Sequence, residues 1–237
     1  MCRLNVNVTY TFDSFVAGET SRLAFSHAVA VAKQPGGAHN PLFLYGPTGC
    51  GKSHLLHAIA HARRAAALGD NMLLLSADTF AAQLIGAIRA DRMPAFRQSI
   101  AAVDMLLLDD APLGQDRPHT LEEIFFNVNQ VVSGGAQVVV TFGMRPSDLG
   151  QHSRASLERA TIAEIGYPDE TTRLELVRRE AERRGMMVPV DARHYLARRL
   201  TGSPRRIQSV MARIAAESTV APQRVDLMYV KRLLARL

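Results

Sequence analysis

The chain has no tryptophan, only two cysteines and no long apolar run, and each absence removes a class of protein. Aromatic residues make up 6% of its 237 residues, which argues against a single-strand binder built on stacked aromatic platforms. Cys2 and Cys50 cannot form a disulfide framework, which favours a reducing compartment. No run of about 18 uncharged apolar residues is present, and the N-terminus lacks the apolar core of a secretory signal. We therefore expect a cytoplasmic protein without a membrane span.

Lysine is also scarce. Among 28 basic residues only Lys33, Lys52 and Lys231 are lysines, and the formal net charge is +6. The positive excess lies in residues 167–237, which carry 15 basic and 8 acidic side chains. Two interpretations stay open: solvated helix faces rich in arginine, or a surface that contacts phosphates or an acidic partner.

The hydrophobic pattern divides the chain into two parts. Up to residue 166, short apolar runs alternate with amphipathic helical stretches, which is typical of a parallel sheet with crossover helices. Beyond residue 166 only helical patterns follow, separated by Gly185, Gly202 and Pro222. We predict an α/β domain over 1–166 and an all-helical domain over 167–237. The expected strands are 41–46, 72–76, 103–108, 137–141 and 161–165.

A phosphate-binding motif follows the first expected strand. Its residues match the pattern G-x-x-x-x-G-K-[ST] between a strand and a helix, and are Gly46, Pro47, Thr48, Gly49, Cys50, Gly51, Lys52 and Ser53. The glycines let successive N–H groups point at phosphate oxygens, and the helix N-terminus adds positive potential. Lys52 would contact the β- and γ-phosphates, and the Ser53 hydroxyl would bind Mg²⁺. The alternative is a glycine-rich turn without a ligand.

Two carboxylates end the third expected strand. Asp109 and Asp110 follow three leucines and would emerge at the carboxyl edge of the sheet, where ligands bind in open α/β sheets. Asp109 would hold Mg²⁺, directly or through water, and Asp110 would orient an attacking water molecule. The alternative is a purely structural role in capping the next segment.

His54, His57 and His61 lie on one face of the helix that follows the phosphate motif. Their spacing resembles that of a zinc site, but no acidic or thiol partner is adjacent in the sequence. We therefore expect no metal at these histidines.

Several further segments carry a family resemblance. They are Tyr10–Gly18, Asn40–Gly46, Ser53–Ile59, Ser76–Phe80, Val103–Asp110, Thr120–Phe125 and Pro168–Arg173. In these segments the chain resembles the AAA+ ATPase domain of the bacterial chromosomal replication initiator DnaA. The resemblance implies a P-loop NTPase with a parallel five-stranded sheet flanked by helices, followed by a small all-helical lid, and it implies ATP or ADP with Mg²⁺ as cofactors.

The same resemblance implies further binding residues. Phe15 and Val16 lie in the segment that flanks the adenine, and His54 lies in the pattern around the phosphate loop. Arg205 would reach the γ-phosphate from the lid; the alternative is a solvated arginine at a helix start. The stretch 80–101 resembles the initiator-specific helical insertion, in which Ile85 would contact single-stranded DNA; the alternative is a core helix with a proline break.

Two departures from the family pattern bear on hydrolysis. The position of the first sensor, usually aspartate, falls on Gly143. The position of the arginine finger falls on Ser156, with Arg154 two residues earlier. An arginine finger contributes several orders of magnitude to the rate of phosphoryl transfer, so the sequence leaves open whether ATP is hydrolysed.

Three functions fit these observations. The first is the ATP-binding module of an initiator, which assembles under ATP control, with itself or with related AAA+ proteins, and engages single-stranded or origin DNA. The second is a short regulator of the Hda type that acts on an initiator through protein contacts at the sliding clamp, although residues 3–8 do not match a clamp-binding peptide. The third is a nucleotide-binding switch without hydrolysis. The chain ends where the family's lid ends, so we expect either part of a longer initiator or a short homologue.

Overall fold

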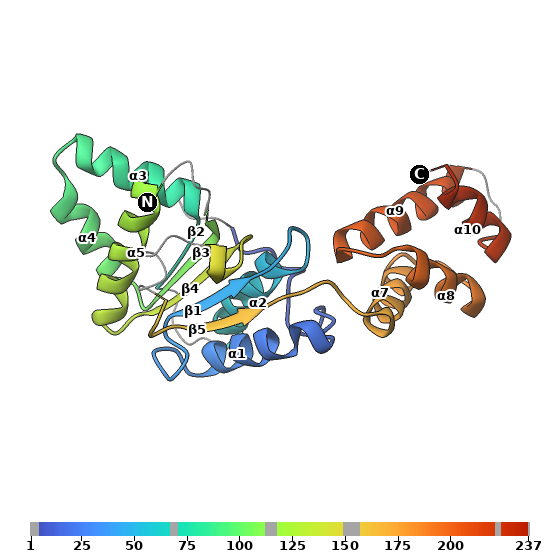
Figure 1. The fold of residues 1–237 in the computed structure, drawn as a ribbon, viewed down its shortest axis with the longest axis horizontal. Helices are drawn as coiled ribbons and strands as arrows, with labels where there is room; N and C mark the ends of the chain where they lie inside the picture. Colours follow the sequence, from blue (N-terminus) through green and yellow to red (C-terminus); the bar gives the residue numbers. More distant parts are fainter. Residues whose placement is uncertain (1–4, 67–70, 112–117, 149–156, 221–223, 237) are drawn as a thin grey trace. The chain divides into compact units, whose positions relative to one another are not determined.

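Five parallel strands form one sheet in the spatial order β2-β3-β4-β1-β5. The computed structural model describes residues 5–66, 71–111, 118–148, 157–220 and 224–236 (Figure 1). The strands are β1 (Leu42–Tyr45), β2 (Met72–Ser76), β3 (Met105–Ala111), β4 (Gln137–Phe142) and β5 (Thr161–Glu164). The order and the shared parallel direction confirm the predicted α/β fold class.

The strands form because their apolar runs are covered on both faces. Helices α1 (Arg22–Lys33) and α2 (Lys52–Ala65) pack against one face (Figure 1). The other face is covered by α3 (Ala77–Arg89), α4 (Met93–Ala101) and α5 (Pro118–Ser133). In strands that are buried on both faces, apolar residues follow one another almost without interruption instead of alternating with polar residues. This explains the three consecutive leucines of β3.

Strand β4 lies between the strand that leads into the phosphate motif and the strand that carries the two aspartates. Its register places Thr141 beside Leu44 of β1 and Val140 beside Leu108 of β3. All of these residues are nearly or fully buried. Strand β4 therefore separates the two predicted parts of the site, the phosphate motif after β1 and the two aspartates of β3.

Some boundaries differ from the predicted ones. Strand β3 continues to Ala111, so it includes both aspartates, and its register against β4 shifts between Leu108 and Ala111. Helix α4 begins at Met93 with Pro94 in its first turn. A proline costs no hydrogen bond there, because the first N–H groups of a helix have no partner within it.

The described structure divides into two compact units. The larger comprises residues 1–15, 22–47 and 51–165, and the smaller comprises 16–21, 48–50 and 166–237. Short 3₁₀ helices lie at η1 (Glu19–Ser21) and η2 (Pro146–Asp148).

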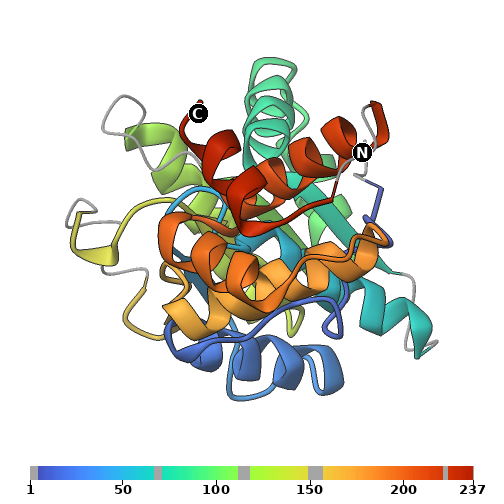
Figure 2. The ribbon, with the colours of Figure 1, turned by 90° about the vertical axis from the view of Figure 1, so that its right-hand side faces the viewer.

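Four helices make up most of the smaller unit: α7 (Glu170–Arg183), α8 (Val190–Arg199), α9 (Pro204–Val220) and α10 (Leu227–Leu234), coloured gold to red in Figures 1 and 2. The side chains of Asp169 and Asp226 cap α7 and α10, each accepting a backbone N–H at 2.7 Å. Apolar residues of all four helices form one buried cluster. None of the described helices combines the length and the apolar character needed to cross a membrane.

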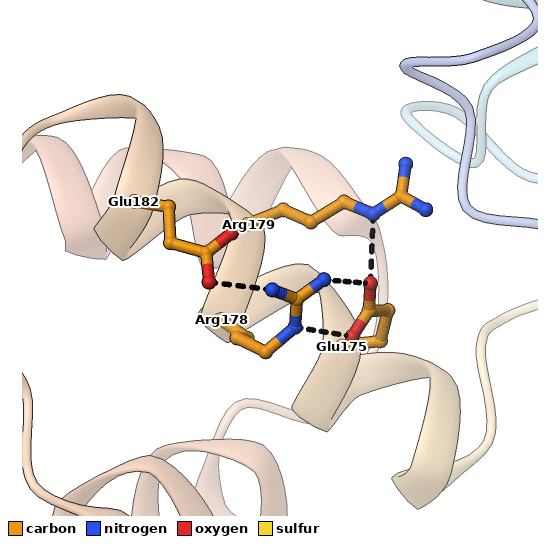
Figure 3. Close-up of polar contacts among 4 residues, drawn as sticks. All are labelled: Glu175, Arg178, Arg179 and Glu182. Atoms are coloured by element: carbon orange, nitrogen blue, oxygen red, sulfur yellow. Dashed lines mark hydrogen bonds and ion pairs between the residues drawn. The ribbon is translucent and has the colours of Figure 1, made fainter.

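The arginines of α7 are largely paired within their own helix (Figure 3). Glu175 accepts hydrogen bonds from Arg178 and Arg179 at 2.7–2.8 Å, and Arg178 also pairs with Glu182. These hydrogen bonds lower the pKa of Glu175 to about 2. For this helix the contacts favour a solvated, arginine-rich helix face over a surface that contacts phosphates or an acidic partner.

Candidate functional site

The phosphate motif forms a loop between β1 and α2 whose shape requires glycine. Gly46 has a φ of 150°, and a Cβ there would lie 2.1 Å from the carbonyl oxygen of Ile165. Gly51 precedes α2 with a φ of 112°, and a Cβ there would lie 2.8 Å from Cε2 of Phe15. Both positions combine a left-handed backbone with a close neighbour, so only glycine fits without displacing another group.

Lys52 is the first residue of α2, and its side chain is held at this loop. Its Nζ donates hydrogen bonds to the carbonyl oxygens of Gly46 at 2.8 Å and Pro47 at 3.1 Å, and the residue is only 7% exposed. A buried ammonium requires such acceptors. The cation therefore lies at a helix N-terminus, where backbone N–H groups and the helix dipole also favour an anion.

The other loop residues differ in exposure. Thr48 is exposed, Pro47 and Gly49 are half-buried, and the Cys50 side chain is buried. Cys50 would therefore contribute to a phosphate site through its backbone N–H.

Ser53 and Asp109 meet directly although they lie far apart in the sequence. The Ser53 hydroxyl donates a hydrogen bond of 3.0 Å to Oδ1 of Asp109. Hydroxyl and carboxylate oxygens are ligands that Mg²⁺ prefers, usually one or two from the protein with the remainder from phosphates and water. Because Ser53 acts here as the donor, the lone pairs of its oxygen remain available to a cation. The residues present therefore fit the predicted metal.

A residue that the sequence did not single out for the site completes this cluster. The Thr141 hydroxyl donates to the same Oδ1 of Asp109 at 2.7 Å and accepts from the backbone N–H of Asp110 at 2.8 Å. The only signal in the sequence is a hydroxyl residue in the apolar strand β4. Asp110 itself is exposed and has a φ of 52°, in the left-handed region that non-glycine residues rarely adopt.

The histidines of α2 hold the N-terminal segment. The ring of Tyr10 stacks on His54 with 4.7 Å between centroids, and His54 Nε2 donates to the carbonyl oxygen of Thr11 at 2.9 Å. The backbone N–H of Asn7 donates to Nδ1 of His57 at 3.1 Å. Burial lowers the pKa of both histidines. Within the described residues no three histidine, cysteine or acidic side chains gather as metal ligands.

Phe15 and Val16, both predicted to flank the adenine, fall in different units. Phe15 is buried in the larger unit, where its ring stacks on Phe25 at 5.7 Å and lies against Gly51. Val16 is half-buried and belongs to the smaller unit. The segment that follows Val16 contacts the residues just before α7, because the Thr20 hydroxyl donates a hydrogen bond to the carbonyl oxygen of Tyr167 at 3.0 Å.

The remaining predicted residues lie in three places. Arg205 is the exposed second residue of α9. Gly143, at the sensor position, is exposed, and a Cβ there would meet no atom within 4 Å. Ile85 lies on α3 with 39% of its surface exposed. Arg154 and Ser156 lie outside the described residues.

Comparisons with known proteins point to one family. The family model described as the bacterial DnaA ATPase domain matches residues 6–160. The chromosomal replication initiator protein DnaA of Thermus thermophilus is 38% identical over 217 residues, which cover 90% of this chain and 50% of that protein. The chain thus spans about half the length of the curated relatives it matches.

Solved structures give the same result. Domain III of the Thermotoga maritima replication initiation protein DnaA superposes with a TM-score of 0.87 at 26% identity, covering 98% of each chain. A structure of the replication initiator DnaA bound to AMPPCP and single-stranded DNA superposes with a TM-score of 0.77 at 27% identity, covering 88% of this chain and 65% of that one.

Proposed function

The chain belongs to the family of bacterial DnaA ATPase domains, and from this premise we propose that it binds ATP and ADP with Mg²⁺ and uses the bound nucleotide to control assembly and DNA engagement in replication initiation. The relatives reported above are initiators, which favours this function over that of a short Hda-type regulator.

The observation that carries the proposal is the direct contact of Ser53 with Asp109 next to the Lys52 loop. The 3.0 Å hydrogen bond brings a hydroxyl and a carboxylate together at the start of α2, where Lys52 is also held. The loop N–H groups and the helix N-terminus would bind the phosphates, and Lys52 would exchange its carbonyl partners for phosphate oxygens. Bound Mg²⁺ would supply charge neutralisation at the β- and γ-phosphates.

We propose that nucleotide binding, rather than fast ATP hydrolysis, determines the functional state of the protein. The exposed Asp110 carboxylate would orient a water molecule toward the γ-phosphate, and Arg205 would approach that phosphate from the helical lid, residues 167–237. Gly143 provides no side chain at the sensor position. The γ-phosphate would then shift the population of lid and core arrangements, which changes the surface offered to a second copy.

DNA engagement is assigned to the helical pair α3 and α4. Ile85 and Ile88 of α3 are 39% and 50% exposed, and exposed apolar side chains can contact the faces of unstacked bases. A similar DnaA structure is described as bound to AMPPCP and single-stranded DNA, which supports DNA engagement as such.

Nucleotide control is tested with Lys52→Ala. Isothermal titration with ATP and Mg²⁺, and sedimentation with ATP or ADP, should show high affinity and ATP-dependent assembly for the wild type and loss of both for the variant. The matched control is Lys33→Ala, which removes an exposed lysine at the end of α1. A wild-type protein without ATP affinity would contradict the proposal.

DNA engagement is tested with Ile85→Ser. Fluorescence anisotropy of a labelled single strand should show binding with ATP that weakens as salt rises, and weaker binding by the variant at every salt concentration. Leu23→Ser, which changes an apolar side chain of α1 that is 70% exposed, should bind like the wild type. Equal affinities of the Ile85 variant and the wild type would exclude α3 as the DNA contact.

A further inference from the structure

Thr141 is a fully buried hydroxyl residue within the apolar strand β4. Its relative exposure is 0%, and Val138, Val139 and Val140 precede it. Parallel pairing places it beside Leu44, two residues before the phosphate motif begins. A hydroxyl buried at such a position must find partners within the protein.

The partners of Thr141 are the two aspartates of β3. Its hydroxyl donates to Oδ1 of Asp109 at 2.7 Å and accepts from the backbone N–H of Asp110 at 2.8 Å. Oδ1 of Asp109 also accepts the Ser53 hydroxyl at 3.0 Å. One carboxylate oxygen is therefore held from two sides, by β4 and by α2. Such a doubly held carboxylate has little freedom to rotate.

The backbone at Asp110 adds a second reason for the contact. Asp110 has a φ of 52° and lies where the register of β3 against β4 shifts, between Leu108 and Ala111. Aspartate adopts the left-handed region more readily than most non-glycine residues, and a hydrogen bond to its N–H fixes that conformation. The Thr141 hydroxyl provides this hydrogen bond, because it accepts from the N–H of Asp110. It therefore influences the direction of both carboxylates.

We propose that Thr141 is a positioning residue of the nucleotide site, whose hydroxyl fixes Asp109 against Ser53 and thereby strengthens the binding of the nucleotide-bound Mg²⁺. The proposal rests on the proposed function, since it concerns the same site. Groups that orient metal ligands typically change metal affinity about 10–100-fold when they are removed. A buried threonine with a purely structural role would change stability alone.

The test compares Thr141→Val with Thr141→Ser. Titration calorimetry measures ATP affinity with Mg²⁺ and with EDTA, and the ratio of the two affinities is the Mg²⁺-dependent gain. In Thr141→Val this ratio should be at least about tenfold smaller than in the wild type, because the carboxylate of Asp109 is no longer held by the hydroxyl. Its affinity in EDTA should stay close to that of the wild type. Thr141→Ser keeps the hydroxyl and should restore most of the gain.

A matched control removes a hydroxyl elsewhere in the same sheet. Thr161 of β5 bonds to His39 and pairs with Leu42, at the opposite end of the strand from the phosphate motif. Thr161→Val should lose a hydrogen bond but keep the Mg²⁺-dependent gain. Thermal unfolding of each variant shows whether it is folded at the temperature of the titration.

The outcomes separate this inference from the proposed function. A wild-type protein that does not bind ATP overturns both. A wild-type protein with a Mg²⁺-dependent gain that Thr141→Val retains overturns only the role of Thr141. If Thr141→Val does not fold, Thr141→Ala takes its place: loss of the Mg²⁺-dependent gain in that variant supports the inference, and a wild-type gain overturns it.

Discussion

The ring of Phe15 lies against Gly51 so closely that a Cβ at Gly51 would come within 2.8 Å of Cε2 of Phe15. The N-terminal segment and the start of α2 therefore pack closely against each other at Gly51, the residue that precedes Lys52. Nucleotide binding and the placement of the N-terminal segment should therefore respond to the same substitutions.

The first prediction concerns Gly51→Ala. The added methyl group meets Phe15, and a φ of 112° strains any residue with a Cβ, so we expect a loss of at least about 1–2 kcal/mol of stability together with weaker ATP binding. Chemical denaturation and titration calorimetry measure the two effects.

The control for this variant is Gly86→Ala. Gly86 lies within α3, and a Cβ there would meet no atom within 4 Å. Alanine should stabilise the helix by about 0.5–1 kcal/mol and leave ATP affinity unchanged. A Gly51→Ala protein that is as stable as the wild type would contradict the described loop geometry.

The second prediction concerns pH and His54. Burial lowers the pKa of His54 below its usual value of 6.5, so between the folded and unfolded pKa values the unfolded chain binds more protons. Stability should therefore fall as the pH decreases below 6.5. His54→Gln should show a smaller fall in melting temperature from about pH 7.5 to about pH 5.5.

The exposed His194 of α8 provides the matched control. His194→Gln reports the background effect of replacing a histidine by glutamine. Identical profiles for the wild type and His54→Gln would show that His54 does not contribute.

The third prediction concerns Glu175 of α7. Its pKa of about 2 lies below the usual 4.5, so its contribution to stability is present above pH 4.5 and is lost as the pH falls toward 2. Glu175→Gln should cost about 0.5–1 kcal/mol at neutral pH, because the residue is partly exposed and solvent screens the pair. This cost should shrink in acid.

Urea denaturation at neutral pH and at about pH 3 measures this cost. Glu182→Gln is the control, since Glu182 pairs with Arg178 and is more exposed; its cost should be smaller. A cost for Glu175→Gln that is the same at both pH values would contradict the ion-pair network of Figure 3.

The fourth prediction concerns Gly143. Because a Cβ there meets no atom within 4 Å, Gly143→Asp should change stability by less than about 0.5 kcal/mol. The carboxylate would stand at the family's sensor position, and we expect ATP turnover to rise by about tenfold because a carboxylate can accept a hydrogen bond from the attacking water molecule and orient it.

A coupled phosphate-release assay measures that turnover. Gly143→Asn matches the size without the charge and should remain near the wild-type rate. Equal rates for the aspartate and asparagine variants would show that charge at this position does not limit turnover.

The elements that could be predicted are those with a local signature. The glycine pattern before Lys52 and the apolar runs of β1 to β5 each extend over a few residues, and they predicted the fold class. The family was predicted from the segments that resemble it. The end of β3 was harder to predict from the sequence, because two aspartates normally indicate the end of a buried strand. Here the strand continues to Ala111 through a shift in register.

Thr141 could not be found from the sequence as a partner of Asp109. The two residues are 32 positions apart and belong to no shared motif. Only the order of the sheet, with β4 beside β3, brings the hydroxyl to the carboxylate. The same holds for the stacking of His54 on Tyr10, because the two residues are 44 positions apart.

By itself the sequence predicted the α/β fold and membership in the bacterial DnaA ATPase-domain family, and it indicated the motif that contains Lys52 and Ser53. Only the tertiary structure decided that Ser53 and Thr141 share one oxygen of Asp109, that Phe15 fills the space beside Gly51, and that the arginines of α7 pair with its own carboxylates. The physical reason is that local patterns set backbone conformation within a few residues. Contacts between distant residues depend on strand order, register and side-chain packing across the whole unit.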